Sequence, residues 1–518
     1  MTTHNSRSNL IIALGVSLGG FLFGFDAAVI SGVTGYIQSE FSLNDLQLGW
    51  VVACLTFASS IAMLTIGPIS DRLGRKSLLQ VTGILYAISA VLSALAPTYA
   101  FLVFARMIGG LAVGSALILA PMYIAETSAP QNRGRMVSIQ QLNIVLGFSA
   151  AYFSNYYLLY LSKSPLDFSM EMNLEQEVWR WMLGIETLPA LLFMIAMMFV
   201  PPSPRWLMLK NRTEQAKKTL ERIHSKAIAK EEFEKMKSSM VNVSAKVPLK
   251  ELLNPSLRMV LSVGVLIAVL QQITGVNAIY FYATNIFEQS GVGKDAAFAQ
   301  AVWVGIINVV FTLIAMFVID HFGRRPLLLI GVVGVVLSMG LTSYGFFQAR
   351  YQLTTETIQE IPEIMVSQDL KNMTAIEYSS DVEFKKDLKS SIGEELFVKH
   401  QSKLIQNSIK MNPLIVLIGI LGFVASFAVS LGPVMWVLLS EIFPNWIRGL
   451  AISAVGFVNS LVSFLVQLAF PWEVSNLGSS LSYLIYAVFA IVGLILLHKY
   501  LPETKGKSLE EIEKELVG

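Results

Sequence analysis

The sequence predicts an all-α membrane protein with twelve membrane-spanning helices in two six-helix halves. Of the 518 residues, 54% are hydrophobic and only 14% are charged, whereas soluble chains carry about a quarter charged residues. The mean hydropathy is +0.59. Apolar stretches of the roughly 20 residues that a bilayer requires occur twelve times, and motifs of the first half recur in the second. These observations exclude an ordinary water-soluble globular protein.

The apolar stretches are arranged as six before and six after a longer polar segment. In order along the chain they cover residues 10–33, 47–67, 77–96, 100–124, 137–160, 180–200, 259–282, 300–319, 327–347, 414–438, 450–471 and 481–501. The first stretch contains Asp26 and has no small-residue cleavage site, so we expect it to be retained as a helix and not removed as a signal peptide. The predicted divisions are an N-terminal half over 1–200, linker helices over 201–257, a C-terminal half over 258–501 and a tail over 502–518.

The distribution of positive charge predicts the orientation of the helices. Residues 201–257 hold 12 Lys+Arg against 6 Asp+Glu, and the connection between the first two helices has no Lys or Arg. Positive residues collect on the cytoplasmic side, so both termini and the linker are predicted to be cytoplasmic, in a plasma or bacterial inner membrane. Residues 348–412, with 8 Lys+Arg against 10 Asp+Glu, are predicted to form a small helical insertion on the extracytoplasmic side.

Three motifs of the first half recur in the second half. The pairs are GPISDRLGRK (67–76) with MFVIDHFGRR (316–325), ETSAPQNRG (126–134) with EIFPNWIRG (441–449), and VPPSPR (200–205) with LPETKG (501–506). The offset is 249 for the first pair and 315 for the second, and the difference of 66 residues corresponds to the insertion. Two six-helix repeats joined by a linker indicate a transporter whose site lies between the halves.

Two charged residues lie well inside the first and fourth apolar stretches. Asp26 is seven residues, roughly 10 Å, below the outer end of its helix, and Arg106 is six residues, roughly 9 Å, below the same face. The matched depth predicts that they pair. Protonation of Asp26 would remove the attraction and allow the pair to separate, which would couple a proton to a rearrangement. The alternative is a static ion pair that fixes helix packing.

Three amides lie in the apolar segment LQQITGVNAIYFY, namely Gln271, Gln272 and Asn277. Buried amides cost free energy unless they are hydrogen-bonded, and amides suit a sugar because they both donate and accept. On an unbroken helix Gln272 and Asn277 would point about 140° apart, so a shared ligand requires the helix to unwind near Gly275. The alternative is hydrogen bonding between helices.

The ordered set of motifs resembles the sugar porter branch of the major facilitator superfamily. It comprises the loop GPISDRLGRK, PMYIAE, the two Glu-to-Arg-Gly motifs, PPSPRWL, LQQITGVN and PETKG. Within the branch the chain most resembles bacterial proton-coupled sugar symporters of the xylose–proton type, and the facilitative glucose transporters are more distant. The resemblance implies the major facilitator fold and alternating access. It also implies proton coupling at Asp26 and Arg106, because facilitative members carry Asn in place of the Asp.

The resemblance also implies a set of substrate-binding residues. They are Phe23, Gln141, Gln271, Gln272, Asn277, Tyr282, Gly432, Trp436 and Asn459. For the aromatic residues the alternative is packing in the core or against lipid. Phe148, Phe281 and Ser460 depart from the pattern of the xylose symporters, so the choice between a pentose, a hexose and a cyclic polyol stays open.

The charged loop motifs imply a gate that closes the cytoplasmic side when the site faces outward. Its predicted members are Asp71, Arg72, Arg75, Glu126, Arg133, Asp320, Arg324, Glu441 and Arg448. The alternative is that the positive loops only set the topology. In the second half Met316 and His321 depart from the repeat, which predicts a weaker latch there. Pro202 replaces the usual Glu of the first tail motif, which puts one contact of the first half in doubt.

The leading hypothesis is a secondary active transporter that imports a monosaccharide with a proton. The alternatives are a passive facilitator, which Asp26 disfavours, and a sugar-sensing receptor. An enzyme is not expected, because the sequence shows no nucleophile with a base, no phosphate loop and no metal-spaced histidines. We expect no cofactor, no metal and no nucleic-acid partner, and we expect a monomer in the lipid bilayer.

Overall fold

The computed structural model describes residues 3–128, 132–164, 170–240, 248–359, 361, 368–444, 446–505 and 511. Within these residues twelve helical segments are long and apolar enough to cross a membrane, which confirms the predicted number of spans. They are Leu10–Gly32, Asp45–Leu73, Arg75–Ala94, Tyr99–Thr127, Gly134–Ser162, Leu174–Phe199, Pro255–Gln289, Lys294–Ile319, Arg324–Phe347, Pro413–Ile442, Arg448–Asn476 and Ser479–Tyr500. Each overlaps one predicted stretch, so the positions of the spans are also confirmed.

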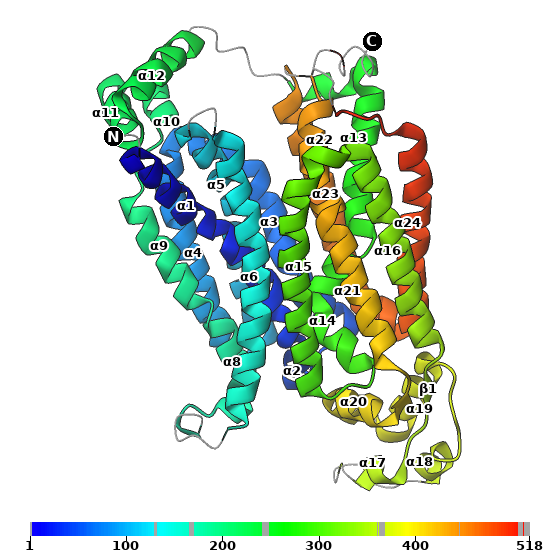
Figure 1. Ribbon diagram of the computed structural model, residues 1–518. Helices are drawn as coiled ribbons and strands as arrows, with labels where there is room; N and C mark the ends of the chain where they lie inside the picture. The colour runs from blue at the N-terminus through cyan, green and yellow to red at the C-terminus, as the bar shows by residue number, and fades with distance from the viewer. Residues whose placement is uncertain are drawn as a thin grey trace. The chain divides into compact units, whose positions relative to one another are not determined.

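The elements of the first half and the linker are almost entirely α-helical (Figure 1). In chain order they are α1 (Thr3–Val29), η1 (Ile30–Gly32), α2 (Thr34–Glu40), α3 (Asp45–Leu73), α4 (Arg75–Ala94), α5 (Tyr99–Thr127), α6 (Arg133–Ser162), α8 (Leu174–Gly184), α9 (Thr187–Phe199), α10 (Pro204–Leu209), α11 (Thr213–Ile223), α12 (Lys226–Met240), η2 (Leu249–Leu253) and η3 (Pro255–Leu257).

The second half adds membrane helices and the predicted insertion. Its elements are α13 (Arg258–Ile273), α14 (Val276–Gln289), α15 (Lys294–Phe322), α16 (Arg324–Phe347), β1 (Arg350–Tyr351), α17 (Thr355–Gln359), α18 (Gln368–Met373), α19 (Asp381–Ile392), α20 (Glu394–Ser408), β2 (Ile409–Lys410), α21 (Pro413–Val429), α22 (Leu431–Ile442), α23 (Arg448–Asn476) and α24 (Ser479–Tyr500). The predicted tail over 502–518 lies largely outside the described residues.

The chain forms two compact units, which differ from a simple division of the sequence. Unit 1 comprises Met1–Asp26, Cys54–Ala151 and Leu183–Pro248, and unit 2 comprises Ala27–Ala53, Tyr152–Met182 and Leu249–Gly518. The boundaries of the two six-helix halves therefore stay a prediction about domain organisation. One end of several first-half helices belongs to unit 2, together with all helices of the second half.

Unit 1 is a bundle in which α4 packs against α5 and α9 (Figure 1). Its apolar core includes Leu79, Tyr86 and Phe193, all fully buried. Helices α1 and α6 approach closely at Gly24 and Gly147, where a Cβ atom on either residue would overlap the opposing backbone. Small residues at such crossings are the usual way in which membrane helices approach one another.

Unit 2 has α16 packed between α21 and α24, and α13 packed against α23. The ends of first-half helices that belong to this unit are joined to it by hydrogen bonds. The Asn155 side chain donates to the carbonyl of Val29 at 2.9 Å and joins two first-half segments. The Tyr152 hydroxyl donates to the carbonyl of Tyr280 on α14 at 2.7 Å and joins the first half to the second. Within unit 2, first-half and second-half helices are therefore held together at the end that the sequence predicts to be extracytoplasmic.

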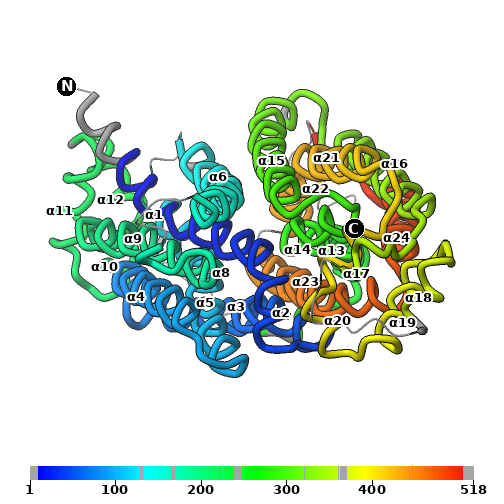
Figure 2. The backbone as a smooth tube through the Cα atoms, turned by 90° about the horizontal axis from the view of Figure 1, so that it is seen from below, coloured from blue at the N-terminus to red at the C-terminus, as the bar shows by residue number. Residues whose placement is uncertain are grey.

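The described residues of the segment 348–412 form a folded insertion, which we call the insertion subdomain. Its short helices α17–α20 and the antiparallel strands β1 and β2 enclose an apolar core of its own, with Tyr351, Phe384 and Phe397 buried. The described part of the insertion is helical, as expected, whereas its bounds and its side of the membrane stay a prediction. Figure 2 shows α20 beside α2, in agreement with the packing between these two helices.

Candidate substrate and proton sites

Asp26 and Arg106 form a buried ion pair in unit 1. Asp26 lies near the end of α1 and Arg106 on α5, and Arg106 Nη1 lies 3.2 Å from Asp26 Oδ1. Only 4% of Asp26 and 2% of Arg106 is exposed. Gly109, one turn after Arg106, leaves the space for the carboxylate, because a Cβ atom there would lie 3.1 Å from Asp26 Oδ2. The predicted pairing is confirmed.

A second buried carboxylate, Glu186, accompanies the pair and was missed by the sequence analysis. It lies at the beginning of α9, is 5% exposed, and interacts electrostatically with both Asp26 and Arg106. The signal in the sequence is an acidic residue inside the predicted span 180–200, where a charge is costly and usually functional. Site 1 therefore contains two carboxylates and one guanidinium; we use this name for Asp26, Arg106 and Glu186.

The polar segment of the seventh span is broken, and this is the break that a ligand shared by Gln272 and Asn277 would require. Helix α13 ends at Ile273 and α14 begins at Val276, with Gly275 between them at a φ of 89°. This left-handed conformation favours glycine, and a Cβ atom at Gly275 would lie 2.6 Å from the Tyr486 ring. The break brings Asn277 Nδ2 to 2.8 Å from Gln272 Oε1. The two amides thus share one location although they lie on different helices.

Four amides from the two halves of this broken span and from α23 form one hydrogen-bonded cluster. Gln272 donates to Asn459 Oδ1 at 3.1 Å, and Asn459 donates to Gln271 Oε1 at 2.8 Å. Gln271 in turn donates to the carbonyl of Leu431 at 2.9 Å. The amide cluster (Gln271, Gln272, Asn277 and Asn459) satisfies much of its own hydrogen bonding, so a ligand must exchange some of these bonds for its own. This geometry agrees with ligand binding and with the alternative of hydrogen bonding between helices.

Sequence analysis missed two polar residues that extend the amide cluster along α23. Asn277 donates to Ser463 Oγ at 2.5 Å, Gln467 donates to the same oxygen at 2.9 Å, and the Tyr282 hydroxyl donates to the carbonyl of Gln467 at 3.0 Å. The signal is the spacing of Asn459, Ser463 and Gln467, because residues four apart share one face of a helix. The polar face of α23 is therefore longer than one residue.

The predicted aromatic and flanking residues occupy different surroundings. Tyr282 is buried against Phe470, at 5.1 Å between ring centroids. Trp436 on α22 is 45% exposed, one turn after Gly432. In unit 1, Phe23 meets Phe148 edge-on at 6.4 Å.

Gln141 is half-buried on α6. Gln141 and Phe23 belong to unit 1, and the other predicted substrate residues belong to unit 2. That all of them surround one substrate stays a prediction.

The gate motif of the first half forms a network around the buried Arg75 side chain, with Asp71 at its exposed edge. Arg75 Nη2 lies 2.9 Å from Asp71 and 3.2 Å from Glu126, and Ser203 donates to the other oxygen of Glu126 at 2.5 Å. Arg72 is exposed. The three motifs of the repeat, which are far apart in the sequence, therefore meet around Glu126.

The gate motif of the second half repeats this network. Arg324 donates from Nε and Nη2 to Glu441 Oε1 at 3.2 and 2.9 Å, and Thr504 donates to Glu441 Oε2 at 2.6 Å. Arg448 donates to the carbonyl of Phe443 at 3.1 Å.

Two members of the predicted gate cannot be placed in these networks, because the side chains of Arg133 and Asp320 lie outside the described part of the structure. The pairs that are seen join residues of the same half. A gate between the halves thus stays a prediction.

The two gate networks differ at one position. Pro202 precedes Ser203 in the first half, and Glu503 precedes Thr504 in the second half. In the second half, Glu503 accepts from the backbone N–H groups of Arg324 and Arg325 at 3.2 Å each, at the N-terminus of α16. Pro202 occupies the corresponding position in the first half and has no carboxylate. Among the described residues, a carboxylate cap of this kind is present in the second half and absent from the first. This agrees with the prediction that Pro202 removes one contact from the first half.

Comparison with known proteins agrees with this arrangement. A family model described as sugar (and other) transporter matches residues 12–359 and 396–516. The arabinose-proton symporter of Bacillus subtilis is 32% identical over 512 residues, covering 99% of this chain and 96% of the relative. The D-xylose-proton symporter of Escherichia coli K12 is 32% identical over 546 residues, with the same coverage. The inward open conformation of the xylose transporter XylE from E. coli matches with a TM-score of 0.74 and 30% identity over 98% of this chain and 99% of that one.

Proposed function

This chain belongs to the sugar transporter family of the major facilitator superfamily, and we propose that it imports one monosaccharide together with one proton by alternating access. It is a membrane transporter and not an enzyme. The observation that carries the proposal is the buried pair of Asp26 and Arg106 with Glu186 beside it. Curated relatives named as proton symporters for arabinose and xylose support the same coupling.

The charge balance of site 1 supports proton binding. One guanidinium cannot neutralise two carboxylates, and an unpaired charge in a buried place is strongly unfavourable. One of the two carboxyl groups therefore holds a proton in the conformation described here. Asp26 is the coupling group in this proposal, because its loss of charge weakens its direct bond to Arg106. Glu186 then keeps Arg106 paired when Asp26 is protonated.

The amide cluster supports a polyhydroxylated substrate. Its members offer both N–H donors and carbonyl acceptors, which match the hydroxyl groups of a sugar. The exposed face of Trp436 suits the apolar side of a sugar ring. The substrate class is a pentose, a hexose or a related cyclic polyol, bound by Phe23, Gln141, Tyr282 and Gly432 in addition to the amide cluster and Trp436.

The orientation and the gates complete the proposal. Both termini lie in the cytoplasm, following the positive charge of the linker over 201–257, and the protein acts as a monomer. The networks around Glu126 and Glu441 hold each half rigid at the cytoplasmic side and present their remaining charges to the other half when the site faces outward.

The test uses proteoliposomes with an imposed inward proton gradient and labelled xylose, arabinose, glucose, galactose and myo-inositol. A potential of 100 mV supplies about 2.3 kcal/mol per charge, which corresponds to roughly fiftyfold accumulation. We expect one of these sugars to accumulate, and we expect Asp26→Asn to abolish accumulation while equilibrative exchange continues. The exposed carboxylate Glu356 provides the matched control, because Glu356→Gln makes the same chemical change on α17 outside the membrane spans.

Three results would contradict the proposal. Uptake that only equilibrates in the unmodified protein would indicate a passive facilitator with a structural ion pair. Binding of a sugar without any uptake would indicate a sugar-sensing receptor. Accumulation that persists in Asp26→Asn would remove Asp26 from the coupling step.

A further inference from the structure

The insertion subdomain is fixed to the second-half helices by hydrogen bonds. Asp381, the first residue of α19, accepts from the backbone N–H of Ser479 at 3.2 Å, at the N-terminus of α24. Ser402 on α20 donates to Glu288 on α14 at 2.6 Å. A carboxylate at a helix N-terminus is favourable because it meets unpaired N–H groups and the positive end of the helix dipole. The insertion subdomain is therefore held in place and is not a loose loop.

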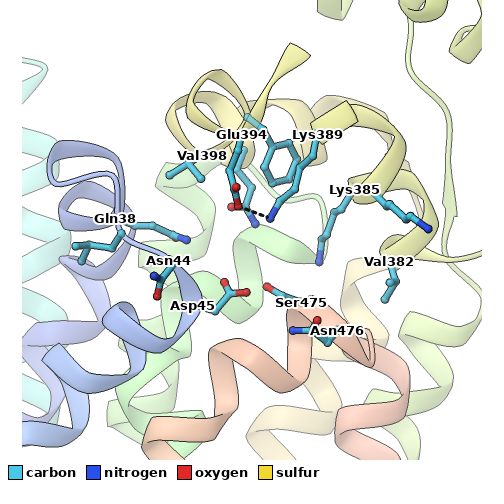
Figure 3. Close-up of a pocket in the computed structure, with 14 residues that line it drawn as sticks. Gln38, Asn44, Asp45, Val382, Lys385, Lys389, Glu394, Val398, Ser475 and Asn476 are labelled. Atoms are coloured by element: carbon cyan, nitrogen blue, oxygen red, sulfur yellow. Dashed lines mark hydrogen bonds and ion pairs between the residues drawn. The ribbon is translucent and has the colours of Figure 1, made fainter. Parts of the chain in front are cut away.

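A cavity of about 270 Å³ lies where the insertion subdomain meets two other segments of unit 2. One wall comes from α19 and α20, another from the segment around Asn44 and Asp45 at the beginning of α3, and a third from Ser475 at the end of α23 (Figure 3). The volume is close to the lower end of small-molecule sites, about 300 Å³. Much of the α19 wall lies in the part of the chain, residues 360–395, that the sugar transporter model leaves unmatched.

The charges around the cavity balance one another. Lys385 pairs with Asp381, which is not part of the lining, at 3.0 Å. Lys389 pairs with Glu394 at 3.3 Å (Figure 3). The remaining carboxylate of the lining, Asp45, interacts electrostatically with Lys389 and Lys385. The lining holds three lysines and two carboxylates, and Asp381, the partner of Lys385, supplies a third negative charge, so the formal charges sum to zero. This balance favours a neutral ligand.

The uncharged part of the lining suits hydroxyl groups. Gln38, Gln401 and Asn476 contribute amides that can donate and accept, and the Ser475 hydroxyl lies beside Asp45. Phe397 contributes an apolar aromatic surface. Alternating donors and acceptors together with an aromatic ring are the groups that recognise a polyhydroxylated molecule.

We propose that this cavity is a second binding site, on the extracytoplasmic side, for a neutral sugar or cyclic polyol. The side of the membrane and the ligand class rest on the proposed function. The cavity walls come from α3 of the first half and from α19, α20 and α23 of the second half, so the site is complete only while these segments stay together. A ligand bound there stabilises this arrangement and slows its opening, and high external sugar thereby inhibits uptake.

The test measures ligand protection of a single cysteine in the cavity, which does not depend on transport. Val398→Cys places a thiol in the lining with little change in volume. The native Cys54 is buried, so background labelling by a membrane-impermeant maleimide is low. We expect the transported sugar, or another member of the panel used above, to slow labelling of Val398→Cys at least fivefold in a saturable manner. Glu395→Cys, exposed on the same helix, is the matched control and is expected to show no protection.

The same measurement in the Gln272→Ala background separates the two sites. Protection that persists when binding to the amide cluster is impaired supports the cavity as the place of binding. Protection that disappears with Gln272→Ala overturns the proposal, because it would report only the conformation of the transport site. Protection by gluconate or phosphate but by no neutral sugar also overturns it, as does the absence of protection by every panel member while uptake is normal.

Discussion

Replacement of Arg106 by methionine gives the most direct test of the electrostatics of site 1. Methionine keeps most of the apolar stem of the side chain but removes the guanidinium that lies 3.2 Å from Asp26. The two carboxyl groups, Asp26 at 4% exposure and Glu186 at 5%, then remain in a buried place without a cation to offset their negative charge. The folded state must bear the cost of these charges or take up protons.

The structure sets the size of the effect. Removal of one partner from a buried ion pair costs about 3–5 kcal/mol, and each 1.4 kcal/mol is about tenfold in an equilibrium constant. We therefore expect Arg106→Met to lower the ratio of folded to unfolded protein by about two to three and a half powers of ten. Adding Asp26→Asn removes the carboxyl group that lost its direct partner and is expected to restore about 2 kcal/mol.

The assay is unfolding in detergent by heat or by denaturant, measured at neutral and at acidic pH. Acidic pH is expected to reduce the loss caused by Arg106→Met, because protonated carboxyl groups carry no charge to bury. Arg258→Met, at an exposed position, is the matched control and is expected to change stability by less than about 0.5 kcal/mol. A loss below about 1 kcal/mol for Arg106→Met, or a double variant no more stable than the single one, would refute the reasoning.

Three further predictions concern other parts of the chain. Glu503→Gln weakens the cap of α16 and is expected to lower stability by about 0.5–1 kcal/mol in the same unfolding assay, and an unchanged stability would contradict the role of the cap. Gly275→Ala places a Cβ atom on left-handed backbone, at a cost of about 1–2 kcal/mol, and against the Tyr486 ring. It is expected to lower both the unfolding temperature and its increase on sugar binding. Burial lowers the pKa of His224 in the folded protein. Below a pH of about 6.5 the unfolded chain therefore binds more protons than the folded protein does, and the stability of the fold decreases as the pH is lowered. His224→Gln should reduce this pH dependence, measured by unfolding at several pH values.

Most of the fold could be predicted from the sequence because apolar length is a direct consequence of bilayer thickness. All twelve spans were located in this way, and the repeat offset of 66 residues located the insertion. The sequence could not predict the two compact units, because these depend on which helix ends pack together. It also could not predict the fold of the insertion subdomain, whose short elements carry weak periodic signals.

The residues of the transport sites could be predicted where a polar or charged side chain interrupts an apolar membrane span. Asp26, Arg106 and the amides near Gly275 stand out because polar groups inside a membrane span are costly, and the structure brings each set together. Glu186 obeys the same rule and lies six residues inside its predicted span, as Arg106 does, so the same signal was present in the sequence and was overlooked. Ser463 escaped notice because serine is common in membrane helices and reveals its role only through its partners.

The two halves use the same motif to secure a helix N-terminus in different ways. Gly74 and Gly323 both have left-handed φ angles, 92° and 89°, and both begin a membrane helix. At Gly323 the nearest neighbouring atoms belong to the Glu503 carboxylate, whereas at Gly74 they belong to the Trp206 ring.

This difference bears on the prediction, from the changes at Met316 and His321, that the second copy of the latch is the weaker one. The contacts inside each half do not show a weaker second copy. The second copy has the Arg324–Glu441 pair and, in addition, a charged cap from Glu503. In the first copy an indole ring covers the corresponding N-terminus and Pro202 removes the carboxylate. The first-half network therefore depends more on Arg75 alone, which contacts both Asp71 and Glu126.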